Sequence, residues 1–163
     1  MVHLDKMDGF SVDQKSALSP DGSKLAFCLS SSMINRVYAI DVKQCLADPG
    51  TCGANRQGPL FGCPWYMAWS PDNTKIVHDD LPDIKVYDLT TGTDTVIDHD
   101  ESLEVTHSMS WSPDGKFIAY SADDGTIGQE VIKVYSFNTG KVNTMIRSDQ
   151  LLLVYGWLTV PEE

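Results

Sequence analysis

Residues 110–120 read Ser-Trp-Ser-Pro-Asp-Gly-Lys-Phe-Ile-Ala-Tyr, and close copies of this phrase occupy residues 17–27 and 68–77. In each copy an apolar stretch ends in Trp-Ser or Leu-Ser, a Pro-Asp-Gly or Pro-Asp-Asn turn follows, and a short run of strand-forming residues resumes. Proline presets φ in such a turn, and glycine or asparagine tolerates the positive φ that the turn requires. Three copies indicate an array of similar units rather than one wound domain.

The copies are spaced like the blades of a β-propeller. The turn residues Asp21, Asp72 and Asp114 are 51 and 42 residues apart, and four-stranded blades take about 40–45 residues. The first interval is longer because it contains a cysteine-rich insertion, residues 45–63. Each unit continues with an alternating stretch such as Ile-Lys-Val-Tyr, which is typical of pleated strands. We therefore expect an all-β fold of three four-stranded antiparallel meanders.

A partial unit follows the third copy. Trp157 lies 46 residues after Trp111, which itself lies 42 residues after Trp69. Complete propellers have about four to eight blades, so we expect an incomplete ring within one 163-residue segment. A second copy, another chain or further sequence would cover the open blade faces. The expected blades are residues 12–62, 64–99 and 105–148, and the start of a fourth is residues 151–158.

The repeat resembles that of TolB-type propellers, in which Trp-Ser-Pro-Asp-Gly-Lys, Ile-x-Val-Tyr and Thr-Gly-Lys follow one another. The resemblance covers about residues 12–158 and extends to the propeller domains of prolyl-oligopeptidase-like peptidases. WD-repeat propellers are the alternative, because Asp-Asp-Gly-Thr-Ile at 123–127 precedes an Ile-Lys-Val-Tyr strand. Tyr87 and Tyr135, however, stand where that family usually has tryptophan. The resemblance implies a propeller, and with it the alternative that the chain belongs to a larger hydrolase and gates access to a catalytic domain.

The four cysteines favour an oxidising compartment. Cys45 and Cys52 flank an Asp-Pro-Gly turn that can bring their Cα atoms within disulfide range, so we predict one disulfide and a periplasmic or extracellular location. The C-x6-C-x10-C spacing lacks a C-x2-C pair and a nearby histidine, which argues against zinc. Cys28 is predicted to be a small buried residue on a strand, whereas Cys63 either pairs with it or stays free. Residues 1–9 are too polar for the apolar region of a secretory signal.

Acidic residues gather in the loops that we expect on one face of the ring. The net charge of −11 argues against nucleic acid or an anionic membrane as the main partner, and no apolar run approaches the roughly 20 residues that cross a bilayer. Nine residues form this acidic rim: Asp79, Asp80, Asp83, Asp98, Asp100, Glu101, Glu104, Asp123 and Asp124. The rim is predicted to attract a basic partner, with solubility as the alternative. Ca²⁺ is a further option, although no D-x-D-x-D-G loop is present.

No catalytic motif is visible, since G-x-S-x-G, Walker, G-x-G-x-x-G and H-E-x-x-H patterns are all absent. Thr106 and His107 lie on an expected innermost strand and are candidates to bind a small ligand in the central channel, with an ordinary strand histidine as the alternative. The repeated tryptophans are predicted to pack between blades, and Asp72 and Asp114 to cap their turns. We therefore predict no enzyme activity, no metal and no cofactor. The expected function is a protein-interaction or scaffold module within a larger assembly.

Overall fold

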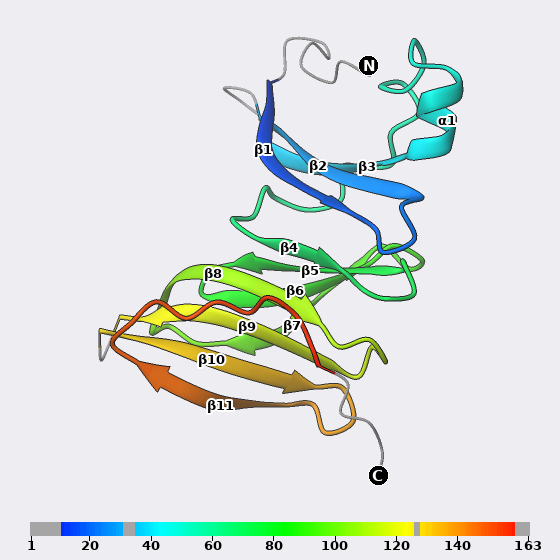
Figure 1. Cartoon of the computed structure of the whole chain (residues 1–163). Coiled ribbons are helices and arrows are strands. Elements are labelled where there is room, and N and C mark those ends of the chain that lie inside the picture. The colour runs from blue at the N-terminus through cyan, green and yellow to red at the C-terminus, as the bar shows by residue number, and fades with distance from the viewer. Residues whose placement is uncertain (1–10, 31–34, 126–127, 159–163) are drawn as a thin grey trace.

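Three antiparallel sheets follow one another along the chain in the computed structural model, which describes residues 11–30, 35–125 and 128–158 (Figure 1). The first contains β1 (Ser11–Leu18), β2 (Lys24–Ser30) and β3 (Asn35–Asp41). The second contains β4 (Met67–Trp69), β5 (Lys75–Asp80), β6 (Asp83–Asp88) and β7 (Thr93–His99). The third contains β8 (Leu103–Trp111), β9 (Phe117–Asp124), β10 (Gln129–Ser136) and β11 (Lys141–Ser148). The predicted all-β class is confirmed.

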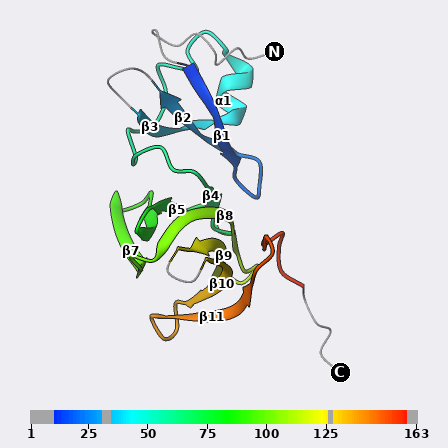
Figure 2. The ribbon, with the colours of Figure 1, turned by 90° about the vertical axis from the view of Figure 1, so that its left-hand side faces the viewer.

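Each sheet is a meander, and its first strand contacts the first strand of the next sheet. The strands of every sheet are hydrogen-bonded in chain order, and the three first strands β1, β4 and β8 contact one another in sequence. Figure 2 shows the three sheets one below the other. Among the described residues, no helix is long and apolar enough to cross a membrane.

The repeated turns share one hydrogen-bond pattern. In the third turn Ser112 Oγ donates to Asp114 Oδ1 at 2.6 Å and accepts from the backbone N–H of Phe117 at 2.9 Å. The equivalent serine-to-aspartate distances are 2.8 Å in the first turn and 2.6 Å in the second. Gly22, Asn73 and Gly115 occupy the position with positive φ, at 71°, 59° and 70°. The predicted capping by Asp72 and Asp114 is confirmed, and it explains why the phrase repeats.

Within residues 11–30 and 35–66, the described part of the first unit, the sheet has three strands where we expected four. The chain leaves β3 into a short helix, α1 (Val42–Ala47), whose first turn is capped by Asp41. The segment 57–61 then runs along the outer edge of β3, where Ala39 N–H donates to Gln57 O at 3.0 Å and Val37 N–H to Phe61 O at 2.9 Å. The segment makes only isolated bridges to β3, and Gly58 within it has a positive φ of 135°, which lies outside the strand region and interrupts the ladder. An irregular loop therefore takes the place of the fourth strand.

Two disulfides hold this insertion. Cys45–Cys52 is present as predicted, with the Cα atoms 4.7 Å apart. Cys28–Cys63 is the second, with the Cα atoms 5.5 Å apart, so of the two alternatives for Cys63 the structure has the bond to Cys28. Cys28 is buried on β2, as expected, but it is bonded. The pairing depends on the path of the insertion across the sheet, which brings together residues that are 35 positions apart.

Aromatic and aliphatic side chains fill the space between successive sheets. The first joint, between the first and second sheets, contains Trp69, Phe61 and Tyr87. The second joint, between the second and third sheets, contains Trp111 and a larger set of aliphatic residues. Trp69 Nε1 donates to Ala17 O at 2.8 Å, and Trp111 Nε1 donates to Ala68 O at 3.1 Å. The prediction that the repeated tryptophans pack between blades is confirmed for these two.

Residues 151–158, where we expected the start of a fourth blade, form no strand. The segment is drawn in red beside β8 (Figure 1), and its Val154 N–H donates to Ser108 Oγ at 2.7 Å. Trp157 stacks on Phe117 with ring centroids 6.1 Å apart. No described strand pairs with this segment, so the extended chain has no ladder to join, and its place in a fourth blade stays a prediction.

Candidate functional site

The loops that carry the acidic rim lie at one edge of the molecule. Asp83 pairs with His99, and Leu103 pairs with Asp124, so the β5–β6 hairpin, the β7–β8 connection and the β9–β10 hairpin share that edge. The edge lies on the left in Figure 1 and faces the viewer in Figure 2. The nine rim residues have unequal environments there, because some are buried in the fold and others face solvent.

Asp79 is a structural residue. Its carboxylate is buried and accepts backbone N–H bonds from Trp65 at 3.0 Å and Tyr66 at 2.5 Å. These bonds hold the chain as it enters β4 and satisfy the buried carboxylate of Asp79. Asp79 is therefore not available to a partner, contrary to its place in the predicted rim.

Asp98 and Asp100 connect the second sheet to the third through what we call the inter-blade clamp, formed with Tyr120 and Lys133. Lys133 donates to Asp98 at 3.3 Å and to Asp100 at 2.5 Å, and its side chain is 8% exposed. Tyr120 OH donates to Asp98, and burial raises the pKa of that phenol. The hydrogen bond from Lys133 holds the pKa of Asp100 at about 2. Both carboxylates therefore stabilise the joint between blades.

Asp124 is also largely withdrawn from solvent, and Arg147 donates to it at 3.1 Å. Asp83 contacts His99 at 2.6 Å and Lys85 at 3.5 Å. The hydrogen bond from His99 holds the pKa of Asp83 below its usual range, and the same bond raises the pKa of His99. These contacts compensate part of the rim's charge within the fold.

The remaining rim residues face solvent. Asp80 is 65% exposed and accepts from Lys85 Nζ at 2.5 Å, and Glu101 is 82% exposed. Glu104 is exposed and Asp123 half-exposed. Among the described residues, the nine carboxylates meet three permanent cations, Lys85, Lys133 and Arg147, which leaves an excess of six negative charges at this edge. The acidic character that the sequence predicted is retained, but fewer residues present it.

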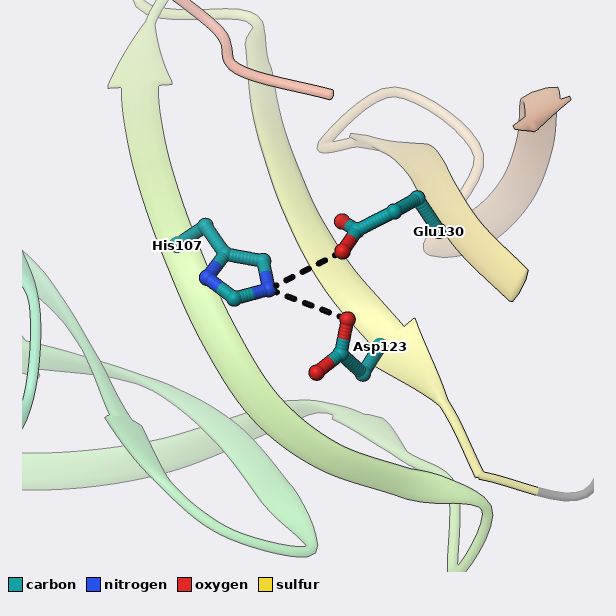
Figure 3. Close-up of side chains that lie close together, drawn as sticks. All are labelled: His107, Asp123 and Glu130. Carbon is teal, nitrogen blue, oxygen red and sulfur yellow. Dashed lines mark hydrogen bonds and ion pairs between the residues drawn. The ribbon is translucent and has the colours of Figure 1, made fainter. Parts of the chain in front are cut away.

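His107 contacts two carboxylates from neighbouring strands (Figure 3). Its Nε2 lies 3.0 Å from Asp123 Oδ1 on β9 and 3.3 Å from Glu130 Oε1 on β10. We call these three residues the His107 cluster; their ligand atoms all lie within 4.8 Å of one another. The register of β8 against β9 shifts between Thr106 and Ser108, and such a bulge redirects the side chain it carries. The group could hold a metal ion.

The two carboxyl groups of the His107 cluster differ in proton affinity. Hydrogen bonds with Glu130 and His107 hold the pKa of Asp123 below its usual range. Burial, followed by the hydrogen bond with Asp123, raises the pKa of Glu130. The closeness of the two carboxyl groups therefore disfavours the state in which both are charged when no cation lies between them.

The sequence pattern groups these residues differently. It predicts Asp123 as part of the rim and His107 as a neighbour of Thr106, and it does not indicate Glu130 as a site residue. Thr106 is fully buried, and its Oγ1 has no hydrogen-bond partner among the described residues. The binding of a small ligand by Thr106 and His107 in a central channel stays a prediction. The signal for Glu130 was its position across the β9–β10 hairpin, because Glu130 and Asp123 are direct cross-strand partners.

Solved structures with similar folds are numerous, although no family model and no curated protein sequence matches this chain. TolB from Acinetobacter baumannii matches 85% of the chain with a TM-score of 0.59 and 21% identity. The fold is that of a TolB-like β-propeller. Oligogalacturonate lyase from Vibrio parahaemolyticus matches 93% of the chain with a TM-score of 0.69 and 12% identity. The β-propeller domain of the Trilobed protease from Pyrococcus furiosus matches 86%, with a TM-score of 0.61 and 14% identity.

The chain spans less than half of each of these structures. It covers 33% of the TolB chain, 45% of the lyase and 43% of the protease propeller domain. The resemblance to a TolB-type repeat is thereby confirmed at the level of the fold, and the three sheets correspond to part of a propeller.

Proposed function

We propose that this propeller segment is a non-catalytic binding module whose acidic rim docks a positively charged protein surface within a larger assembly. The observation that carries the proposal is the exposure of Asp80, Glu101 and Glu104 on loops at one edge. Among the described residues, the nine rim carboxylates outnumber the permanent cations that pair with them by six. A surface of one charge sign accelerates the encounter with an oppositely charged partner and suppresses wrong partners.

The buried rim residues support this role by fixing the loops. Asp79 anchors the entry to β4, and the inter-blade clamp holds the β7–β8 connection against the third sheet. Charges that are presented on a rigid frame lose less conformational entropy on binding than charges on mobile segments. The same proposal places the protein in the periplasm or outside the cell, which agrees with its two disulfides.

The test is a comparison of charge neutralisation on and off the rim. The triple variant Asp80→Asn, Glu101→Gln, Glu104→Gln is titrated with a fluorescent decalysine peptide at 150 mM salt, and we expect its affinity to fall about tenfold, given roughly 0.2–1 kcal/mol per exposed charge pair. The matched single variants are Glu101→Gln and Asp48→Asn, because Asp48 is an exposed carboxylate on the distant insertion. Asp48→Asn is expected to change affinity less than twofold. Equal losses from both single variants would mean that only the net charge matters, and the rim would not be a binding surface.

A second function is favoured by the similarity to the propeller domain of a protease, which the chain covers to 43%. In that case the segment belongs to a larger hydrolase and its ring limits access to a catalytic domain. A G-x-S-x-G elbow on the same polypeptide outside these 163 residues would favour the hydrolase over the binding module.

A further inference from the structure

The His107 cluster directs two carboxylate oxygens at a single imidazole nitrogen. His107, Asp123 and Glu130 come from β8, β9 and β10 of one sheet, so the strand ladder sets their spacing. The nitrogen lies 3.0 Å from one oxygen and 3.3 Å from the other. Ligand atoms that surround a metal ion at about 2.0–2.2 Å are separated by roughly 3.0–3.5 Å in tetrahedral or octahedral geometry. The separations from the nitrogen are those of a metal-binding group.

The metal-free arrangement leaves charge and hydrogen-bonding capacity uncompensated. Asp123 and Glu130 are direct cross-strand partners, and like charges in that position are destabilising. Among the described residues, His107 is the one basic side chain within ion-pair distance of either carboxylate. Glu130 Oε2 is buried and has no hydrogen-bond partner among those residues. A bound cation would compensate both deficits.

The carboxylate side of the cluster is open to solvent. Asp123 and Glu130 line an open, polar hollow of about 310 Å³ together with Glu104 and Asp149, whereas His107 is not among its lining residues. The hollow has room for waters beside the two carboxylates.

His99 provides an internal contrast on the same edge. It also contacts two carboxylates, but Nδ1 faces Asp83 at 2.6 Å while Nε2 faces Glu101 at 3.4 Å. Two carboxylates that contact different ring nitrogens lie on different sides of the ring and cannot share one ion with it. The His99 group therefore has the composition of the His107 cluster without its geometry.

We propose that His107, Asp123 and Glu130 bind a divalent transition-metal ion of the zinc class. The imidazole ligand selects this class over Ca²⁺ and Mg²⁺, which prefer all-oxygen sites. The ion stabilises the β9–β10 hairpin at the rim by bridging its two strands to β8. This proposal is independent of the partner that the rim binds.

The test is zinc binding to the metal-free, untagged 163-residue chain by isothermal titration calorimetry. We expect one Zn²⁺ per chain and weaker binding of Ca²⁺. Replacing a direct ligand costs more than the roughly 10–100-fold that loss of an outer-shell partner costs, so His107→Ala should lower zinc affinity by more than 100-fold. His99→Ala is the matched control and should stay within twofold of the wild type.

A second pair of variants guards against misfolding of His107→Ala. Glu130→Gln keeps the size of the side chain and removes one ligand charge, and Glu101→Gln is its control near His99. Zinc should raise the melting temperature of the wild type and of Glu101→Gln, because a ligand of the folded state stabilises it, and leave that of Glu130→Gln unchanged. Absence of zinc binding to the wild type, or equal binding to wild type and both cluster variants, would overturn the proposal.

Discussion

Each of the two joints between successive sheets contains the tryptophan of the repeat, Trp69 or Trp111, but the contacts that reinforce it differ between the joints. At the first joint Phe61 from the cysteine-rich insertion stacks on His78 with ring centroids 3.9 Å apart, beside Trp69. At the second joint the inter-blade clamp joins Asp98 and Asp100 to Lys133 beside a larger aliphatic core. One joint is thus reinforced by aromatic packing from an insertion and the other by a buried ion-pair network.

The difference separates what the repeat does from what the variable loops do. Trp69 and Trp111 each donate an indole N–H to the carbonyl of the preceding sheet, so the repeat sets how blades stack. Phe61, Asp98, Asp100 and Lys133 lie outside the repeated Ser-Pro-Asp phrase, and only Tyr120 of the clamp belongs to it. Each joint therefore has its own reinforcing contacts. Most of the acidic residues that the sequence suggested for partner binding serve the second joint or the loops next to it.

The largest expected effect is the loss of a joint tryptophan. Trp111→Ala should lower the free energy of unfolding by about 3–5 kcal/mol, because it leaves a cavity in the core and removes the bond to Ala68 O. Urea denaturation monitored by circular dichroism measures the change. Trp69→Ala should have a similar effect if the tryptophans are equivalent at the two joints.

The corresponding phenylalanine variants test the hydrogen bond separately. Trp111→Phe and Trp69→Phe keep most of the packing and should each cost clearly less than the alanine variants. If Trp111→Ala is destabilising by less than about 1 kcal/mol, the tryptophan does not carry the second joint.

The next effect concerns the first joint alone. Removing the Cys28–Cys63 disulfide with Cys28→Ser and Cys63→Ser should lower the free energy of unfolding by about 3–4 kcal/mol, because the cross-link closes a long loop in the unfolded chain. Removing Cys45–Cys52, which closes a loop with a sequence separation of 7, is the matched control and should cost about 2–3 kcal/mol. Guanidinium denaturation of both double variants compares them. A larger loss from the short loop would contradict the view that Cys28–Cys63 is the main covalent support of Phe61.

The smallest effect is expected at the inter-blade clamp. Lys133→Met leaves two carboxylates without their cation, and since Asp100 is a third exposed, we expect a loss of about 2 kcal/mol rather than that of a fully buried pair. Lys116→Met is the control, because its pair with Asp114 is exposed and contributes at most about 1 kcal/mol.

The pH dependence of stability sharpens this prediction. The pKa of Asp100 is about 2 in the folded protein, whereas an unperturbed aspartate has a pKa of 3.8. The charged carboxylate therefore stabilises the fold above pH 4, and this stabilisation is lost as the pH falls from about 4 to 2. The difference in stability between wild type and Lys133→Met should therefore shrink across this range. A constant difference would show that Lys133 acts by packing and not by its charge.

Local patterns were predictable and contacts between distant segments were not. The capping by Asp72 and Asp114 lies within a few residues of each turn, and the periodic Trp69 and Trp111 indicated their common role. The fourth strand of the first sheet was wrongly expected, because the positive φ of Gly58 and the path of the insertion replaced it with a loop. Among the candidate site residues, the sequence indicated an acidic edge but did not distinguish Asp79, which is buried, from Asp80, which is exposed.

The amino-acid sequence by itself determined the blade unit of this protein, because each Ser-Pro-Asp turn and the strands it joins are stabilised by contacts within the same short segment. The tertiary structure decided three further features: the Cys28–Cys63 bond, the division of the rim into buried and exposed carboxylates, and the meeting of His107 with Glu130. These depend on strand register, on a bulge in β8 and on the path of an insertion, and such long-range geometry is set by the packing of whole sheets.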